Sequence, residues 1–212
     1  MYCTATTSRN GHWTMTTVDG LGRTIKVETG YGTTTVSVVE TEYAPCACSP
    51  MGKVKRVSMP HAPGATAIWT TYNYDVMGRT TSVTAPDGSA TTYAYVGNTL
   101  TVTDPAGKWK KYTNDAFGNL VEVVEPKDAN NTYTTSYTYN AFNKLTLVTM
   151  PRDGVTQTRT FVYDSAQQLQ SITNPESGTT TYSHTPYGRL EYKVDAAGNR
   201  VEYSYDAYNR LT

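Results

Sequence analysis

The sequence has few of the residues on which catalytic and metal sites depend. Its 212 residues include only three histidines and three cysteines, and His12, His61 and His184 lie far apart in the sequence. No Gly-x-Ser-x-Gly, His-Glu-x-x-His or phosphate-loop motif is present. These absences argue against hydrolases, metalloproteases and nucleotide-binding enzymes. We therefore predict no enzymatic activity, no bound metal and no cofactor.

Aliphatic residues and long apolar segments are also scarce. The 8 Leu, 3 Ile, 19 Val and 3 Phe residues make up about 16 per cent of the chain, which is below the level typical of a packed core. No ten-residue stretch has the apolar spacing of a helix. No segment approaches the ~20 apolar residues of a membrane span, and no signal peptide is visible. The formal net charge is zero, so nothing supports nucleic-acid binding.

Threonine and tyrosine are abundant instead. The chain contains 39 Thr and 18 Tyr residues, and both types favour the half-buried surface of a β-sheet. Each tyrosine ring can bury roughly 150–250 Å² while its hydroxyl finds a partner. Tyrosine therefore supplies the burial that aliphatic residues do not, and a thin sheet needs less aliphatic filling than a two-sheet sandwich.

A tyrosine–aspartate motif recurs about every two dozen residues. It is clearest at residues 72–79, with the sequence Tyr-Asn-Tyr-Asp-Val-Met-Gly-Arg. The later copies are residues 112–119, 137–144, 161–168, 182–189 and 203–210. Their turn positions are residues 78, 118, 143, 167, 188 and 209, so the steps are 40, 25, 24, 21 and 21. The first is a double step, because residues 93–98 contain a further tyrosine pair. A period of this size indicates an array of repeats.

Each repeat predicts a strand, a tight turn and a second strand. Tyrosines two residues apart point to one face of a strand, and we expect the tyrosines of successive repeats to stack into a ladder across neighbouring strands. The Asp or Asn that follows can accept a backbone hydrogen bond and open a turn, and the Gly or Asn three residues later suits a positive φ. Gln167 breaks this pattern, which predicts a longer or bulged loop there. The structural turn residues are Tyr72, Tyr74, Asp75, Gly78, Arg79, Asp115, Gly118, Tyr137, Tyr139, Asn140, Asn143, Tyr163, Asp164, Gly188, Arg189, Tyr203, Tyr205, Asp206 and Asn209.

A second set of turn signals, mostly rich in proline and glycine, alternates with the first. These signals are residues 86–88, 105–107, 126–128, 151–154, 175–178 and 195–198. Short β-prone runs such as 120–124 and 145–149 lie between the two sets. Strands separated by turn signals every ~8–12 residues predict an all-β chain of tandem antiparallel hairpins in one continuous twisted or spiral sheet.

The repeats resemble the YD repeats of RHS proteins, a family that includes bacterial polymorphic toxins, C components of insecticidal toxin complexes and, more distantly, teneurins. The resemblance covers roughly residues 14–212, and residues 19–24 look like a degenerate copy of the turn motif. It implies a spiral sheet that forms a hollow shell, which in the toxin members holds a C-terminal effector. This chain lacks the effector and the family's aspartate-rich self-cleavage motif, of which residues 104–107 match only part. We interpret it as an internal fragment of a longer protein.

The array divides into three predicted parts. Residues 1–40 form degenerate N-terminal repeats, residues 41–66 an irregular Pro- and Cys-containing insertion, and residues 67–212 the regular YD array. The insertion reads as a loop or cap. Cys46 and Cys48 flank one residue, a spacing that we expect to disfavour a bond between them. A disulfide from Cys3 to one of them, a zinc site completed by His61, and free thiols all remain open.

The predicted function is a non-catalytic stretch of a secreted or cell-surface β-shell. Its partners are the rest of the parent RHS protein and its C-terminal effector. One alternative is a surface adhesion or glycan-binding array, in which Trp13, Trp69 and Trp109 stack on sugars. A second is a self-assembling filament subunit, which associates through its edge strands. A third is a carbohydrate-active enzyme with a carboxylate pair such as Glu122 and Glu125, although carboxylates recur in every turn for structural reasons.

Overall fold

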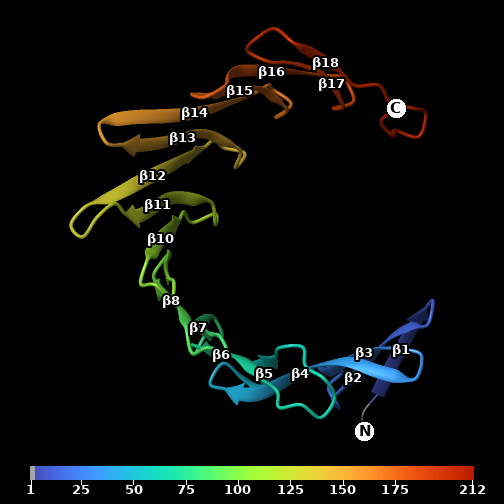
Figure 1. Cartoon of the computed structure of the whole chain (residues 1–212). Helices are drawn as coiled ribbons and strands as arrows, with labels where there is room; N and C mark the ends of the chain where they lie inside the picture. Colours follow the sequence, from blue (N-terminus) through green and yellow to red (C-terminus); the bar gives the residue numbers. More distant parts are fainter. Residues whose placement is uncertain (1–2) are drawn as a thin grey trace. The chain divides into compact units, whose positions relative to one another are not determined.

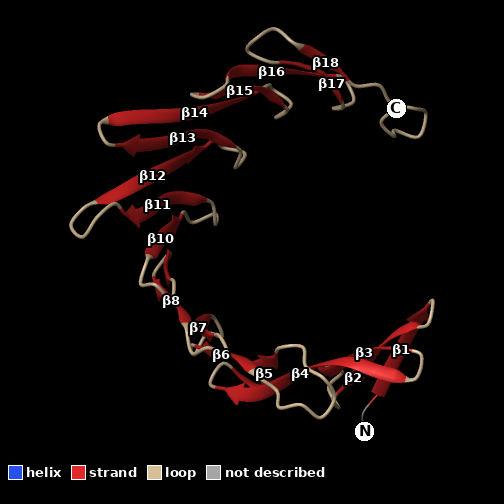
Figure 2. Cartoon of the chain, viewed as in Figure 1, coloured by secondary structure: helices blue, strands red, loops and turns tan. Residues whose placement is uncertain are grey.

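The computed structural model describes the backbone of residues 3–212 and the side chains of residue 6 and residues 8–212. Over this range the chain forms 18 β-strands and no helix (Figures 1 and 2). The all-β prediction is therefore confirmed. The described residues include no helix that is long and apolar enough to cross a membrane.

The chain divides into two compact units. Unit 1 comprises residues 1–94 and 102–108, and unit 2 comprises residues 95–101 and 109–212. The first nine strands are β1 (Cys3–Arg9), β2 (His12–Val18), β3 (Thr24–Tyr31), β4 (Thr34–Cys46), β5 (Ser49–Ser58), β6 (Trp69–Tyr74), β7 (Thr80–Thr84), β8 (Ala90–Val96) and β9 (Thr99–Thr103). The other nine are β10 (Trp109–Asn114), β11 (Leu120–Pro126), β12 (Thr132–Tyr139), β13 (Leu145–Arg152), β14 (Val155–Tyr163), β15 (Leu169–Asn174), β16 (Gly178–His184), β17 (Leu190–Val194) and β18 (Arg200–Glu202).

Within each unit, strands pair with their neighbours in the sequence. In unit 1, β1 to β8 form a series of antiparallel pairs in chain order. In unit 2, β10 to β18 do the same. Each hairpin closed by a tyrosine–aspartate turn shifts register by one residue just before the turn, as at Thr113 and Asn114. The predicted series of tandem hairpins is thus present in both units.

In the part of the chain whose side chains are described, neither unit has an extended apolar core. Among the described residues, the buried apolar side chains are Val38 and Val148, and the buried polar ones are Ser58 and Thr135. Most strand residues are half-buried, because each sheet is a single layer whose two faces are covered only by its own side chains. This architecture explains how a chain poor in aliphatic residues forms a regular structure.

The segment 41–66 contains more regular structure than we predicted. Strands β4 and β5 run through it and pair from Thr41 with Val57 to Cys46 with Ser49. Beyond β5, His61 forms an isolated antiparallel bridge with Val38. The expectation of a loop or cap was therefore wrong for residues 41–58, where β-formers alternate on either side of a short tip. The three-part division of the chain stays a prediction.

Candidate functional site

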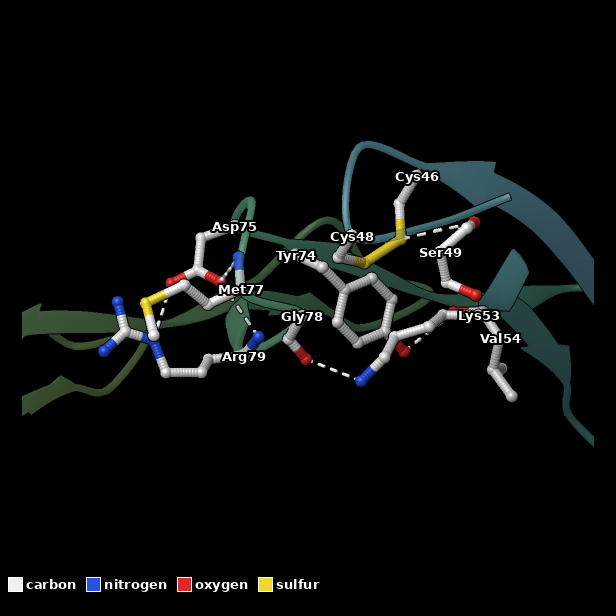
Figure 3. The surroundings of a disulfide bond; sticks show 10 residues. All are labelled: Cys46, Cys48, Ser49, Lys53, Val54, Tyr74, Asp75, Met77, Gly78 and Arg79. Atoms are coloured by element: carbon white, nitrogen blue, oxygen red, sulfur yellow. Dashed lines mark hydrogen bonds and ion pairs between the residues drawn. A yellow bond between two sulfur atoms is a disulfide. The ribbon is translucent and has the colours of Figure 1, made fainter. Parts of the chain in front are cut away.

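The tyrosine–aspartate turn is the most regular polar structure in the chain, and the copy at Asp75 shows its parts (Figure 3). The backbone N–H groups of Met77 and Arg79 each donate to Oδ1 of Asp75 at 2.9 Å. The Nε of Arg79 donates to Oδ2 at 2.7 Å. Gly78 has φ of 79°, and its N–H donates to the Asp75 carbonyl at 3.0 Å. The result is a short β-turn followed by a left-handed residue, a common hairpin loop.

These hydrogen bonds favour the ionised carboxylate. Burial alone would raise the pKa of Asp75, but donors from the backbone and side chain of Arg79 outweigh it, and the pKa is lowered. At Asp206 the backbone N–H of Arg210 is the largest cause of a lowered pKa. The carboxylate is therefore held in its charged form as part of the turn, which is a structural role.

The same turn recurs along both units. Oδ1 of Asp19 accepts hydrogen bonds from the backbone N–H groups of Leu21 and Arg23 at 2.9 Å. The degenerate copy of the motif at residues 19–24 therefore forms a complete turn. The left-handed position is occupied by Gly78 (φ 79°), Gly118 (86°), Asn143 (57°), Gln167 (60°), Gly188 (81°) and Asn209 (66°). The positive φ predicted at Gly78 and Gly118 is confirmed.

Gln167 does not lengthen its loop, and that prediction was wrong. Its N–H donates to the carbonyl of Asp164 at 3.0 Å, as glycine does in the other turns. Its side chain accepts a hydrogen bond from Nδ2 of Asn140 at 3.0 Å. This bond comes from the preceding repeat and offsets the backbone cost of the left-handed conformation, which the local sequence could not reveal.

The residue four positions after the aspartate closes the turn from the other side. Arg23, Arg79 and Arg210 each place Nε 2.7 Å from Oδ2 of their aspartate. Asn119 uses its amide for the same bond, at 3.0 Å. We had assigned Arg79 to the motif without this bond. The constant spacing between acid and base was the available signal, since it recurs in three repeats.

The second tyrosine of several repeats joins one hairpin to the one before it. Its hydroxyl donates to a backbone carbonyl 15 to 20 residues earlier. The pairs are Tyr74 with Val54 (2.8 Å), Tyr139 with Leu120 (2.8 Å), Tyr163 with Leu145 (3.0 Å) and Tyr205 with Leu190 (3.0 Å). Burial raises the pKa of Tyr74 and of Tyr139. The hydrogen bond from each of the four hydroxyls ties two repeats together.

The predicted alternation of faces is confirmed. Tyr137 and Tyr139 are half-buried, whereas Thr138 between them is exposed. Ser204 is likewise exposed between two half-buried tyrosines. We also predicted a ladder of stacked tyrosine rings. In these repeats the ladder is built instead from hydroxyl-to-carbonyl bonds, because the tyrosine of one repeat reaches the backbone of the preceding strand pair.

Comparison with known proteins identifies the family. The family described as Teneurin YD-shell matches residues 62–212. This chain belongs to the YD-shell family. No curated protein matches its sequence. The resemblance to RHS and YD-repeat proteins is thereby confirmed.

Solved structures show the same fold at low sequence identity. The YD-shell chain is similar to the crystal structure of TcdB2-TccC3, with a TM-score of 0.74 and 16% identity over 94% of this chain and 12% of the other. A form of that protein described as lacking its hypervariable C-terminal region gives 0.74 and 15%. The Tc holotoxin pore of Photorhabdus luminescens gives 0.57 and 16%, over 94% of this chain and 13% of the other. The chain thus spans about an eighth of the length of these toxin chains.

The YD-shell segment contains a disulfide that we did not expect. Cys46 and Cys48 are bonded at the tip between β4 and β5, with their Cα atoms 5.2 Å apart (Figure 3). This distance is normal for a disulfide, because the chain reverses at Ala47. A Cβ atom added to Gly78 would lie 3.4 Å from Cβ of Cys48, and Lys53 Nζ donates to the Gly78 carbonyl at 2.6 Å. The bonded tip therefore packs against the Asp75 turn.

The disulfide removes two ligands of the zinc site that we considered as an alternative. With Cys46 and Cys48 in a disulfide, neither thiolate is available to zinc. The side chain of Cys3 lies outside the described residues. Within the described part of the chain, no three His, Cys, Asp or Glu side chains cluster in a way that could hold a metal ion.

The residues proposed for sugar chemistry have structural partners in the YD-shell fold. Glu125 is bound by Lys110 at 2.8 Å and Arg152 at 2.9 Å. The hydrogen bond from Lys110 is the largest cause of its lowered pKa, whereas a general acid needs a raised one. The guanidinium of Arg56 lies 4.1 Å from the ring centre of Trp69 and so covers one of its faces.

Proposed function

We propose that this YD-shell segment forms part of the wall of a hollow shell, and that this shell encloses or presents a C-terminal effector. We also propose that the segment itself performs no catalysis. The observation that carries the proposal is the single-layer sheet, in which Val38 and Val148 are the buried apolar residues of the described chain. A sheet without a second layer cannot support a deep active-site pocket. It is suited to separating two compartments.

The hydrogen bonds within and between repeats support a wall that is stable without a second layer of structure. In the turns that open with Asp or Asn, backbone N–H groups donate to the side chain of that residue, and each hydroxyl of the ladder joins one repeat to the previous one. In a repeat array, stability is approximately a sum of repeat and neighbour terms. The wall can therefore extend over many repeats without a central core.

The effector and the location of the protein come from the neighbours by analogy. One similar structure is named for the absence of a hypervariable C-terminal region, and another for a holotoxin pore. A protein of that kind acts outside the cell that makes it, so we assign this segment to a secreted or cell-surface protein. The Cys46–Cys48 disulfide supports this assignment, because disulfides persist in oxidising compartments.

The test uses the complete gene product that contains this segment. A protease digests it under native conditions, and the cleavage rate of the C-terminal domain is compared with that of the same domain expressed alone. Enclosure predicts protection of at least about tenfold, since cleavage then requires an opened wall. Equal rates would show that the domain lies outside the wall.

A pair of variants separates enclosure from intrinsic resistance of the effector. Tyr139→Phe combined with Tyr163→Phe removes two ladder bonds and is expected to increase the cleavage rate. Tyr208→Phe, at an exposed turn tip, serves as the matched control and leaves the rate unchanged.

A further inference from the structure

We propose that two copies of this chain associate through one edge of unit 2, turn against turn. The surface consists of four consecutive turns, at residues 115–119, 140–144, 164–168 and 185–189, which we call the turn row. The fifth turn of this series, at residues 206–210, has its two charges paired with each other, Arg210 with Asp206, and lies beyond the row. These turns follow β10, β12, β14 and β16, so alternate connections of the hairpin series place them on one edge of the sheet (Figure 1). The proposal concerns contacts between chains and does not depend on an enclosed effector.

The turn row exposes large apolar side chains at one repeated position. The third residue of the turn is Phe117, Phe142 or Tyr187 in three of the four turns, and these are 81%, 66% and 85% exposed; in the remaining turn it is Ala166. The backbone N–H groups of Phe117 and Phe142 donate to the side chain that opens the turn, but their rings take no part in it. The turn therefore needs the backbone of this position and leaves its ring without an intrachain role.

The opposite edge of the same unit shows that an aromatic ring is not required there. Asn130 and Ala197 occupy the equivalent position and make the same bonds from their N–H groups, to Asp128 and Asp195. The two edges share the backbone bond and differ in the side chain above it. A regular series of exposed rings on one edge is the pattern of a contact surface.

The charges of the turn row alternate in sign. The only charged residue is Asp115 in the first turn, Lys144 in the second, Asp164 in the third and Arg189 in the fourth. The series of net charges is therefore negative, positive, negative, positive. When such a row meets a copy of itself in the reverse direction, every turn faces a turn of opposite charge. This is the self-complementarity that a two-fold interface requires.

The sizes of the apolar tips match the same arrangement. With the two-fold axis midway along the row, the second turn of one copy meets the third turn of the other, so Phe142 faces Ala166. The first turn meets the fourth, so Phe117 faces Tyr187. An open hollow of about 560 Å³ lies between the first two turns and is lined by Phe117 and Tyr137. It gives the ring of the partner copy a place to enter.

The area available is sufficient for a weak dimer. Successive tips are about 10 Å apart, because two strands separate them. Three rings at about 150 Å² each, with the surrounding turn backbone, offer roughly 600 Å² per copy. A pair of copies then buries about 1,200 Å², the lower limit of specific interfaces. We expect a reversible dimer with a dissociation constant in roughly the micromolar range.

The test is sedimentation velocity of the purified chain across a concentration series. Lys144→Glu makes the second turn negative, so that it meets the negative third turn of the partner, and is expected to weaken the dimer by more than about tenfold. Ser165→Lys with Gln168→Lys makes the third turn positive and has the same effect. The three substitutions together restore opposite charges and restore the dimer, which no general loss of folding could do.

Two further variants test the apolar part. Phe142→Ser is expected to weaken the dimer by more than about tenfold, since it removes a central ring. Val155→Ser, which is 64% exposed at the opposite edge, is the matched control and leaves association unchanged. All variants are checked for the wild-type far-ultraviolet circular dichroism spectrum.

Three results would overturn the proposal. One is a wild-type chain that stays monomeric at all concentrations. In that case the turn row would instead contact another segment of a longer protein. Another is association that persists in Lys144→Glu and Phe142→Ser, as pairing through edge strands would give. The third is failure of the triple variant to recover association.

Discussion

Replacement of Gly118 isolates the contribution of left-handed backbone to the stability of a YD turn. Gly118 has φ of 86°, and a Cβ atom added there would have no heavy atom within 4 Å. A substitution therefore meets no steric obstacle from neighbouring residues. Any loss of stability must come from the conformation itself.

The magnitude follows from the backbone preference of each side chain. A β-branched residue in a sparsely populated region costs about 1–3 kcal/mol, so Gly118→Val should lower the free energy of unfolding by that amount. Asparagine tolerates the left-handed region better. It already occupies this position as Asn143 and Asn209, with φ of 57° and 66°. Gly118→Asn should therefore cost about 1 kcal/mol or less.

Thermal and urea unfolding followed by circular dichroism measure the difference. For a chain of this size, 1 kcal/mol corresponds to about 2–4 °C in Tm. The valine variant should melt several degrees below wild type, and the asparagine variant close to it. Gly20→Val, at a glycine without positive φ and with no neighbour within 4 Å of its added Cβ, is the control. Equal destabilisation by valine and asparagine at position 118 would refute the reasoning.

Two other predictions concern the ladder and the turn carboxylates. Tyr139→Phe and Tyr163→Phe each remove one hydroxyl-to-carbonyl bond and should cost about 0.5–1.5 kcal/mol in urea unfolding. The control Tyr208→Phe, at an exposed turn tip, should leave the free energy of unfolding unchanged. A neutral result at both ladder positions would remove the ladder as a source of stability. The pKa of Asp115 is lowered from 3.8, chiefly by the side chain of Asn119, so its contribution to stability is present above that pH and is lost as the pH falls through the lowered value. Asp115→Asn retains the acceptor that Asn140 uses in its own turn and should flatten the loss of Tm between about pH 5 and pH 2; an unchanged acid slope would contradict this assignment.

The sequence predicted the local structure well, because each turn is specified by residues within five positions of one another. Asp75 and Gly78 are enough to indicate the turn, since the carboxylate accepts the backbone N–H groups and the glycine takes the positive φ. The alternation of faces follows from the same strand geometry. Tandem hairpins then need no information about distant residues.

The errors occurred where distant residues decide the structure. Gln167 is stabilised by Asn140 of the preceding repeat, and Tyr139 bonds Leu120 rather than stacking on another ring. The Cys46–Cys48 disulfide is an exception, because there a local turn at Ala47 brings the two cysteines to a bonding distance that we did not expect from their spacing. The exposed rings of the turn row were present in the sequence, but their meaning depends on which turns share an edge.

The pairing of each strand with its sequence neighbours has a consequence for synthesis. Most contacts are local, so the entropy lost in closing each loop is small and the usual slowness of all-β folding does not apply. A repeat of about two dozen residues takes one to several seconds to leave the ribosome, at roughly 5–20 residues per second, whereas a hairpin forms in about 1–10 μs. Each hairpin can therefore dock on the previous one before the next is made. The sheet therefore grows in the direction of translation, and its growing edge at any moment is a single strand.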